Sequence, residues 1–309
     1  MKNAQSLVLL VVIACCSKLQ AAPQRFLGVD ESRGQLIYVD TTDASKSWAV
    51  SLPVKCRDIQ LIGKQRVLLS GSNGYYEYDL TTRSCIKTFS KPDYAGTMSV
   101  RRSPEGHTLI GCIQQGNTVI YELDANDQQL RKALFSGRKS LRLMRATREG
   151  TLLFGGPDNT IVEADMNGAI RREIVIPGGR HVYQALRMPS GSTIVASGYG
   201  SAVIEFDADG KELRRFAASA EDKTRGVNTQ FFAGMQILPD GSVVVCNWTG
   251  HRPEDSQKGP QLLQFDKDGK LVWSWHDAAF AGTLHGVIVL DHLNGDVLCD
   301  DSNGVLAPR

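Results

Sequence analysis

The stretch Tyr76-Glu77-Tyr78-Asp79, followed after a polar turn by Cys85-Ile86-Lys87-Thr88-Phe89, decides the fold because it recurs along the chain. It has the pattern of a short strand ending in Asp, a turn and a second strand. Equivalent units lie at 36–40, 119–124, 161–165, 203–207 and 262–266. The six aspartates are 39, 45, 41, 42 and 59 residues apart, so four intervals fit a four-stranded propeller blade and the last contains an insertion.

A second pair of strands lies between consecutive copies of this unit. The clearest example is Met235-Gln236-Ile237-Leu238-Pro239-Asp240-Gly241-Ser242-Val243-Val244-Val245, in which Pro-Asp-Gly supplies a tight reversal. The equivalent turns contain Gly63, Gly106, Gly150, Gly191 and Gly295. Each repeat is therefore four short antiparallel strands, and the chain is predicted to be an all-β, six-bladed β-propeller.

The two ends of the chain carry similar segments. Cys299-Asp300-Asp301-Ser302-Asn303-Gly304-Val305-Leu306 matches Val29-Asp30-Glu31-Ser32-Arg33-Gly34-Gln35-Leu36 in its pattern. We therefore expect N- and C-terminal strands to share one blade, which removes the open edge of the ring. Both ends offer a copy of the second strand and six blades need only one, so seven blades is the alternative.

The N-terminus has the order of a secretory signal. Lys2 precedes an apolar run over 7–14, and small residues end at Ala21-Ala22. We predict a signal over 1–22 and a single propeller domain over 23–309, exported to the periplasm or the cell exterior. Val12-Ile13-Ala14-Cys15 resembles a bacterial lipobox, so lipidation at Cys15, with the signal ending before it, is the competing route. The mass of the mature N-terminus distinguishes the two.

Composition excludes several classes of partner and site. The net charge is +2 with no basic run, so we exclude nucleic acid, and no stretch after the leader is apolar enough for a transmembrane helix. The cysteines beyond the leader are odd in number and irregularly spaced, and we predict that Cys112, Cys246 and Cys299 belong to the core. The Asp-x-Asp-Gly sequences at Asp207 and Asp266 lack the remaining EF-hand ligands. They are interpreted as turns, and no metal site is predicted.

The sixth repeat, Leu263-Gln264-Phe265-Asp266-Lys267-Asp268-Gly269-Lys270-Leu271-Val272-Trp273-Ser274-Trp275, resembles the blade motif of quinoprotein-like (PQQ-repeat-like) propellers and bacterial arylsulfotransferases. His285-Gly286-Val287-Ile288-Val289-Leu290 with Asn294-Gly295-Asp296-Val297-Leu298 is similar to the His-bearing inner strand and hairpin of the latter. The resemblance implies the fold over most of 26–304. Quinoprotein dehydrogenases use an adjacent-cysteine disulfide, and the only such pair here is Cys15-Cys16 in the leader, so no cofactor is expected. Arylsulfotransferases are longer chains with a catalytic His.

In a propeller, the loops that lead into the inner strands and the loops that follow the second strands meet on one face, around the central channel. Ligands bind at this face. Alignment on the hairpin glycines places His181 and His285 at or beside the start of an inner strand. There each imidazole acts as a base, nucleophile or ligand, or alternatively only caps a loop through a hydrogen bond. The insertion after Val245 breaks the repeat. The predicted ligand-binding residues are His181, Tyr199, Asn247, Trp248, His251, His285, Asp300 and Asp301, with Asp30 in the loop equivalent to the last two.

Three functions remain open at this point. The leading hypothesis is an exported, non-catalytic propeller that binds a small molecule, glycan or partner protein at one face of the channel. The alternative is a hydrolase or group-transfer enzyme with His285 or His181 as nucleophile or general base, although the sequence lacks the common catalytic sequence motifs. A second alternative is an assembly scaffold anchored by lipid at Cys15. An enzyme needs a His near a charged partner in a deep pocket, whereas protein binding needs an exposed apolar patch.

Overall fold

The computed structural model describes residues 22–155 and 159–309. The predicted signal, including Cys15, lies outside these residues except for Ala22. Within the described part of the chain, no helix is both long and apolar enough to cross a membrane.

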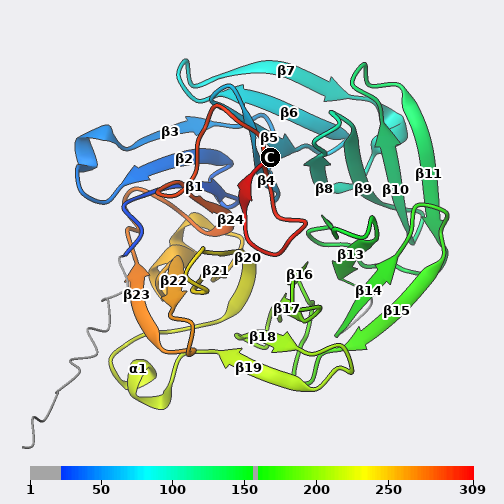
Figure 1. Cartoon of the computed structure of the whole chain (residues 1–309). Coiled ribbons are helices and arrows are strands. Elements are labelled where there is room, and N and C mark those ends of the chain that lie inside the picture. The colour runs from blue at the N-terminus through cyan, green and yellow to red at the C-terminus, as the bar shows by residue number, and fades with distance from the viewer. Residues whose placement is uncertain (1–21, 156–158) are drawn as a thin grey trace, which may run out of the picture.

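Six four-stranded antiparallel sheets form a ring around a central channel (Figure 1). From the inner to the outer strand, blade 1 is β24 (Leu284–Val289), β1 (Arg25–Asp30), β2 (Gln35–Asp40) and β3 (Trp48–Ser51), and blade 2 is β4 (Ile59–Gly63), β5 (Arg66–Ser70), β6 (Gly74–Asp79) and β7 (Ser84–Ser90). Blade 3 is β8 (Thr97–Arg102), β9 (Thr108–Gln114), β10 (Asn117–Leu123) and β11 (Gln129–Phe135), and blade 4 is β12 (Arg145–Ala146), β13 (Leu152–Gly155), β14 (Thr160–Ala164) and β15 (Ile170–Val175). Blade 5 is β16 (Gln184–Arg187), β17 (Thr193–Ala196), β18 (Val203–Phe206) and β19 (Glu212–Phe216), and blade 6 is β20 (Phe231–Ile237), β21 (Val243–Trp248), β22 (Leu262–Phe265) and β23 (Leu271–Trp275).

The remaining elements lie outside the blades. They are the two-stranded sheet of β25 (Cys299–Asp300) and β26 (Ala307–Pro308), the helix α1 (Ala220–Thr224), and the short 3-10 helices η1 (Ala44–Lys46), η2 (Pro92–Tyr94) and η3 (Pro253–Lys258). The six-bladed all-β propeller predicted from the repeat is confirmed, and the seven-bladed alternative is wrong.

Two kinds of turn hold the strands of each blade together. The hairpin glycines between the inner and second strands have a positive φ, for example +85° at Gly106 and +83° at Gly241, which favours glycine over other residues. The aspartates after the third strands accept backbone hydrogen bonds: Asp207 Oδ1 from Asp209 N (2.9 Å) and Lys211 N (2.8 Å), with the same arrangement at Asp266. The prediction that the Asp-x-Asp-Gly sequences are turns is confirmed.

The N- and C-terminal parts of the chain close the ring in blade 1. β1 pairs with β2 on one side and with β24 on the other, where Phe26 lies opposite Val289. The predicted sharing of strands is confirmed, and the N-terminal copy of the second strand is the one in the blade. The C-terminal copy is not, because β24 already has β1 as its neighbour, and Gly295 makes no hairpin within the blade. Its carbonyl accepts a hydrogen bond from Gln65 N in blade 2 (2.8 Å).

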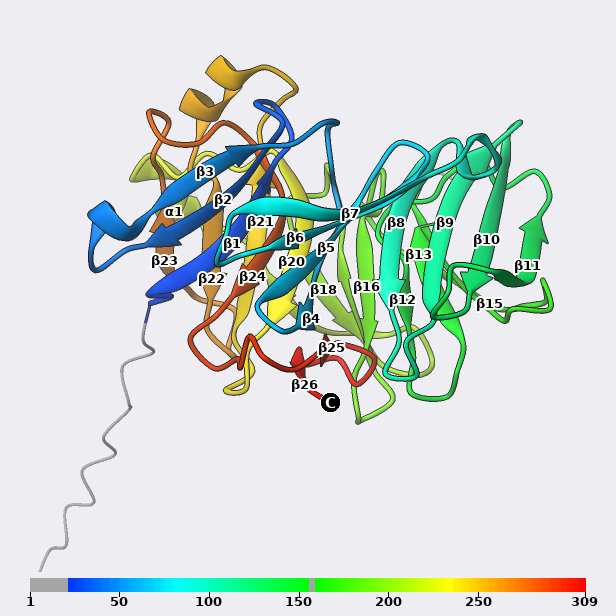
Figure 2. The same ribbon diagram turned by 90° about the horizontal axis from the view of Figure 1, so that it is seen from above.

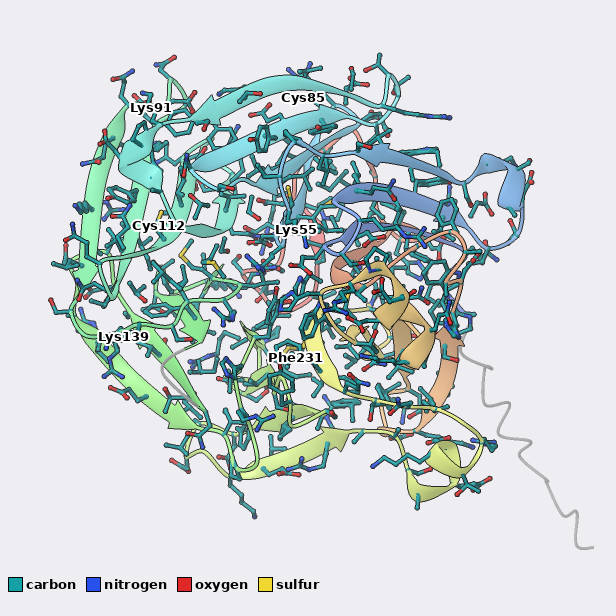
Figure 3. The ribbon with its side chains drawn as sticks, turned by 180° about the vertical axis from the view of Figure 1, so that it is seen from behind. Lys55, Cys85, Lys91, Cys112, Lys139 and Phe231 are labelled. Atoms are coloured by element: carbon teal, nitrogen blue, oxygen red, sulfur yellow. The ribbon has the colours of Figure 1, made fainter. Side chains whose placement is uncertain are left out.

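The C-terminal arm, defined as residues 299–309, lies across one end of the channel (Figures 1 and 2). Its β25 pairs with β26, and Gln60 Nε2 donates a hydrogen bond to the Cys299 carbonyl (3.0 Å). This end is where the hairpin glycines lie, and we call it the hairpin face. The inner strands start at the other end, the loop face, which carries η3 and is seen from the front in Figure 3.

Four of the five cysteines among the described residues belong to the core. Cys112 in β9 and Cys246 in β21 have no exposed surface, and burial raises the pKa of the Cys112 thiol to about 11. Cys56 and Cys299 are also buried, whereas Cys85 is exposed on the outer strand β7. All five are free thiols, so the prediction of core cysteines without a disulfide framework is confirmed for the described residues.

Candidate functional site

A pocket of about 360 Å³ opens at the loop face of the channel. Successive blades supply its walls, because the residue at or just before each inner strand faces the channel. The lining residues are Arg57, Met98, Ile113, Arg142, His181, Tyr183, Tyr199, Phe231, Trp248, His251 and His285. Lys55 and Phe231 lie on either side of the centre of this face in Figure 3.

A stack of three rings forms one wall of the pocket. His285 lies between Tyr183 and Trp248, with ring centroids 5.4 Å and 5.2 Å apart and interplanar angles of 8° and 11°. Phe231 meets both Trp248 and Tyr183 edge-on, at 5.5 Å in each case. The stack thus covers both faces of the imidazole and leaves only its edge for other contacts.

The edge of this stack carries three buried polar atoms without a hydrogen-bond partner among the described residues. They are Tyr183 Oη, Trp248 Nε1 and His285 Nδ1, and their residues are 2%, 7% and 4% exposed. A buried polar group without a partner costs roughly 1–3 kcal/mol, and native proteins contain few of them. The residues of all three atoms line this one pocket.

Charged side chains line the pocket or lie beside it. Glu31 is 1% exposed, and its Oε1 is 3.2 Å from His251 Nδ1 and 3.6 Å from Arg57 Nη2. Arg142 is half-buried, and its Nη1 donates a hydrogen bond to the carbonyl of Leu141 (3.1 Å). Burial lowers the pKa of the Arg142 guanidinium, yet an arginine keeps its charge in proteins.

His285 is held in its neutral form. Burial, followed by the positive charge of Arg57, lowers the pKa of the imidazole well below its ordinary value. Burial also raises the pKa of the Tyr183 hydroxyl, which therefore keeps its proton. The Tyr183 hydroxyl and the Trp248 indole N–H are consequently available as donors, and His285 contributes an uncharged imidazole nitrogen.

The structure brings five of the predicted site residues together. His181, Tyr199, Trp248, His251 and His285 all line the loop-face pocket, although they come from blades 1, 5 and 6 and the insertion after β21. The edge-to-face contacts of Tyr199 with Phe231 (4.7 Å) and of His251 with Trp248 (4.6 Å) link them.

Asn247 is not in the pocket. It has no exposed surface, and its side chain joins three loop segments: the Oδ1 accepts from Gln230 N (2.9 Å), and the Nδ2 donates to the carbonyls of Asn228 (2.9 Å) and Pro260 (2.8 Å). Its role in these contacts is to anchor the loops that carry the neighbouring Trp248.

The expected position of Asp300 and Asp301 was wrong. Both lie at the hairpin face in the C-terminal arm, because that arm crosses the channel instead of joining a blade. Asp301 is paired there with Arg101 and Arg145, each at 2.8 Å. Asp30 is buried in its own turn, where it accepts hydrogen bonds from Ser32 Oγ (3.0 Å) and Gly282 N (2.6 Å).

Sequence reasoning missed Glu31, Arg57, Arg142 and Tyr183. A signal for two of them exists in the repeat: Arg142 and Tyr183 each lie eight residues before the hairpin glycine of their blade, as does Met98. Glu31 and Arg57 could not be found in this way, because Glu31 lies beyond the second strand and blade 2 is shorter at this point. Among the described residues no group of three or more His, Cys, Asp or Glu side chains is arranged to hold a metal ion.

No protein-family model matches the sequence, and no curated protein matches it. Solved structures do resemble the chain. A protein of unknown function from Bacteroides caccae is 22% identical with a TM-score of 0.72, over 86% of this chain and 98% of that one. A streptogramin B lyase is 10% identical (TM-score 0.56, 86% and 92% covered), and the WD40 β-propeller domain of Doa1 is 12% identical (0.59, 91% and 87%). At these identities the likeness shows the fold alone, so the chain is similar to β-propellers of more than one activity.

Proposed function

We propose that this propeller binds a small organic molecule in the loop-face pocket. The observation that carries the proposal is the set of three buried, unpartnered polar atoms on Tyr183, Trp248 and His285. A bound molecule with matching polar groups would satisfy these atoms and recover the free energy that they cost the unliganded protein.

The surface supports a small molecule over a partner protein. The exposed large apolar side chains, other than Tyr199, lie on the outer strands of the blades or beside them, away from the loop face: Ile86, Leu130, Leu134, Ile170, Val175, Leu213 and Val272. The loop face instead offers a pocket whose wall contains buried polar groups.

The variant Tyr183→Phe tests the proposal. It removes only the hydroxyl and leaves the ring stack, so ligands found by a thermal-shift screen of a small-molecule library should bind roughly five- to ten-fold more weakly in calorimetry. Its stability should stay the same or rise, because an unpaired buried hydroxyl is lost.

Tyr75→Phe is the matched control. The Tyr75 hydroxyl has a partner, Asp127, outside the pocket, so this variant should lose stability and keep the wild-type affinity. A screen without hits, or hits that bind Tyr183→Phe and the wild type equally, would contradict the proposal.

A second candidate function is acid–base catalysis, favoured by the contact between His251 and the buried carboxylate of Glu31 (3.2 Å). A carboxylate on one ring nitrogen orients an imidazole for proton transfer at the other. Among the residues that the structure describes, no carboxylate contacts His285, the candidate from the sequence, and burial holds it neutral.

If this function is real, the wild type should convert at least one bound compound to a product visible by mass spectrometry. Glu31→Gln should then lower kcat about 10²- to 10⁴-fold with little change in KM, since the ligand would still bind. Binding without turnover by the wild type would leave the non-catalytic function.

A further inference from the structure

The residues that line the loop-face pocket carry mostly hydrogen-bond donors. The Tyr183 hydroxyl and Trp248 indole N–H are buried and unpartnered, and the guanidiniums of Arg57 and Arg142 have donors only. Among the described residues, Glu31 is a carboxylate beside the pocket, and it already contacts His251 and Arg57. A ligand that matches this set must be rich in acceptors.

Arg142 differs from the other arginines of the channel. At the hairpin end, Arg145 pairs with Asp58 (3.0 Å) and Asp301 (2.8 Å), and Arg101 pairs with Asp301 (2.8 Å). Among the described residues, no ion pair with a carboxylate is found for Arg142. A half-buried guanidinium normally has an anionic partner, since burial of a charge is costly unless the charge is paired.

Among the described residues, positive charge exceeds negative charge around this pocket. Arg57 and Arg142 line it, Lys55 lies near it, and Glu31 is a carboxylate that contacts both His251 and Arg57. Burial keeps His285 neutral, and the positive charges of Arg57, Arg142 and Lys55 lower its pKa further. An anionic ligand would offset part of this positive charge.

We propose that the ligand is a small organic oxyanion, a carboxylate, sulfate or phosphate, whose anionic group binds Arg142 and Arg57 and accepts hydrogen bonds from Tyr183 and Trp248. Its apolar part contacts apolar residues that line the same pocket, Met98 and Ile113 from blade 3 or Phe231 from blade 6. Guanidinium groups suit this role because they make charge-assisted, bidentate hydrogen bonds to such anions. The inference rests on the proposed small-molecule function and specifies the ligand class.

The experiment compares four probes with one ring by isothermal titration calorimetry: phenylacetate, phenyl sulfate, phenyl phosphate and the neutral phenylacetamide. At least one anion should bind the wild type roughly ten-fold or more tightly than the amide, and the ranking of the three identifies the oxyanion. Arg142→Gln should abolish this preference and change the affinity for the amide by less than about two-fold. Arg142→Lys, which keeps the charge, should retain part of it.

Arg148→Gln is the control, because Arg148 is exposed in the hairpin of the same blade and should leave all four affinities unchanged. Circular dichroism confirms that each variant is folded. Equal affinities for anions and amide, or the same loss for every probe in Arg142→Gln, would overturn the oxyanion inference while leaving small-molecule binding intact. If none of the four binds the wild type, the oxyanion class is wrong, and the library screen with Tyr183→Phe decides the proposed function separately.

Discussion

Replacing Arg145 with Met should lower the free energy of unfolding by about 3–5 kcal/mol, the usual cost of removing one partner from a buried ion pair. Arg145 makes two hydrogen bonds to Asp58 (3.0 and 3.2 Å) and one to Asp301 (2.8 Å), and its side chain is 5% exposed. Met fills much of the same volume but leaves two buried carboxylates short of a counter-charge. Urea unfolding followed by fluorescence measures the loss.

Arg148→Met controls for the loss of a positive charge from the same blade. Arg148 is exposed, so its replacement should change stability by no more than about 0.5 kcal/mol. Adding Asp58→Asn to Arg145→Met removes the buried carboxylate that lost its ion-pair partner, whereas Asp301 still has Arg101 (2.8 Å), so the double variant should recover part of the loss. Equal stabilities of Arg145→Met and Arg148→Met would show that the network contributes little to folding.

Gly198→Ala should destabilise the protein by about 2–4 kcal/mol, because it combines backbone strain with a steric overlap. Gly198 has a φ of +62°, and a Cβ there would overlap the carbonyl oxygens of Arg180 and His181. The Gly198 carbonyl also accepts a hydrogen bond from Phe232 N (2.9 Å), so this residue joins two loops of the pocket. Ligand affinity should therefore fall together with stability.

Gly178→Ala separates strain from overlap. Gly178 has a similar φ, +72°, but a Cβ there would meet no atom within 4 Å. This variant should lose only the strain energy, about 1–2 kcal/mol, and keep its affinity for ligands. Thermal denaturation and calorimetry with any ligand from the screen measure both effects. A Gly198→Ala variant no worse than Gly178→Ala would contradict the role given to the close contact.

The fold could be predicted from the sequence because the turn residues recur at the spacing of the blades. Backbone geometry favours glycine at the inner hairpin, which blades 2 to 6 have, and aspartate after the third strand, so these residues mark the repeats even where the strands differ. The site was partly predictable for the same reason: His181 and His285 occupy similar positions in different blades, and ring symmetry brings such positions to one channel.

Other features of the site depend on which strands pair, and the sequence does not state this. Residues 25–30 and the C-terminal copy have similar patterns, but only one could lie beside β24, so Asp301 was expected at the wrong end of the channel. The predicted position of Asn247 in the pocket was wrong for another reason. All of β21 is buried, so the alternation of apolar residues does not show which side chains face the channel.

The pairing of β1 with β24 also constrains the order in which the protein can fold. Phe26 and Val289 are neighbours in blade 1 but are separated by most of the chain, and ribosomes make the N-terminal part first. β1 can therefore pair with β24 only after almost the whole polypeptide has been synthesised. Such distant contacts make folding slow. During synthesis, the strand that completes the finished ring is an uncovered apolar edge on which nascent chains can aggregate.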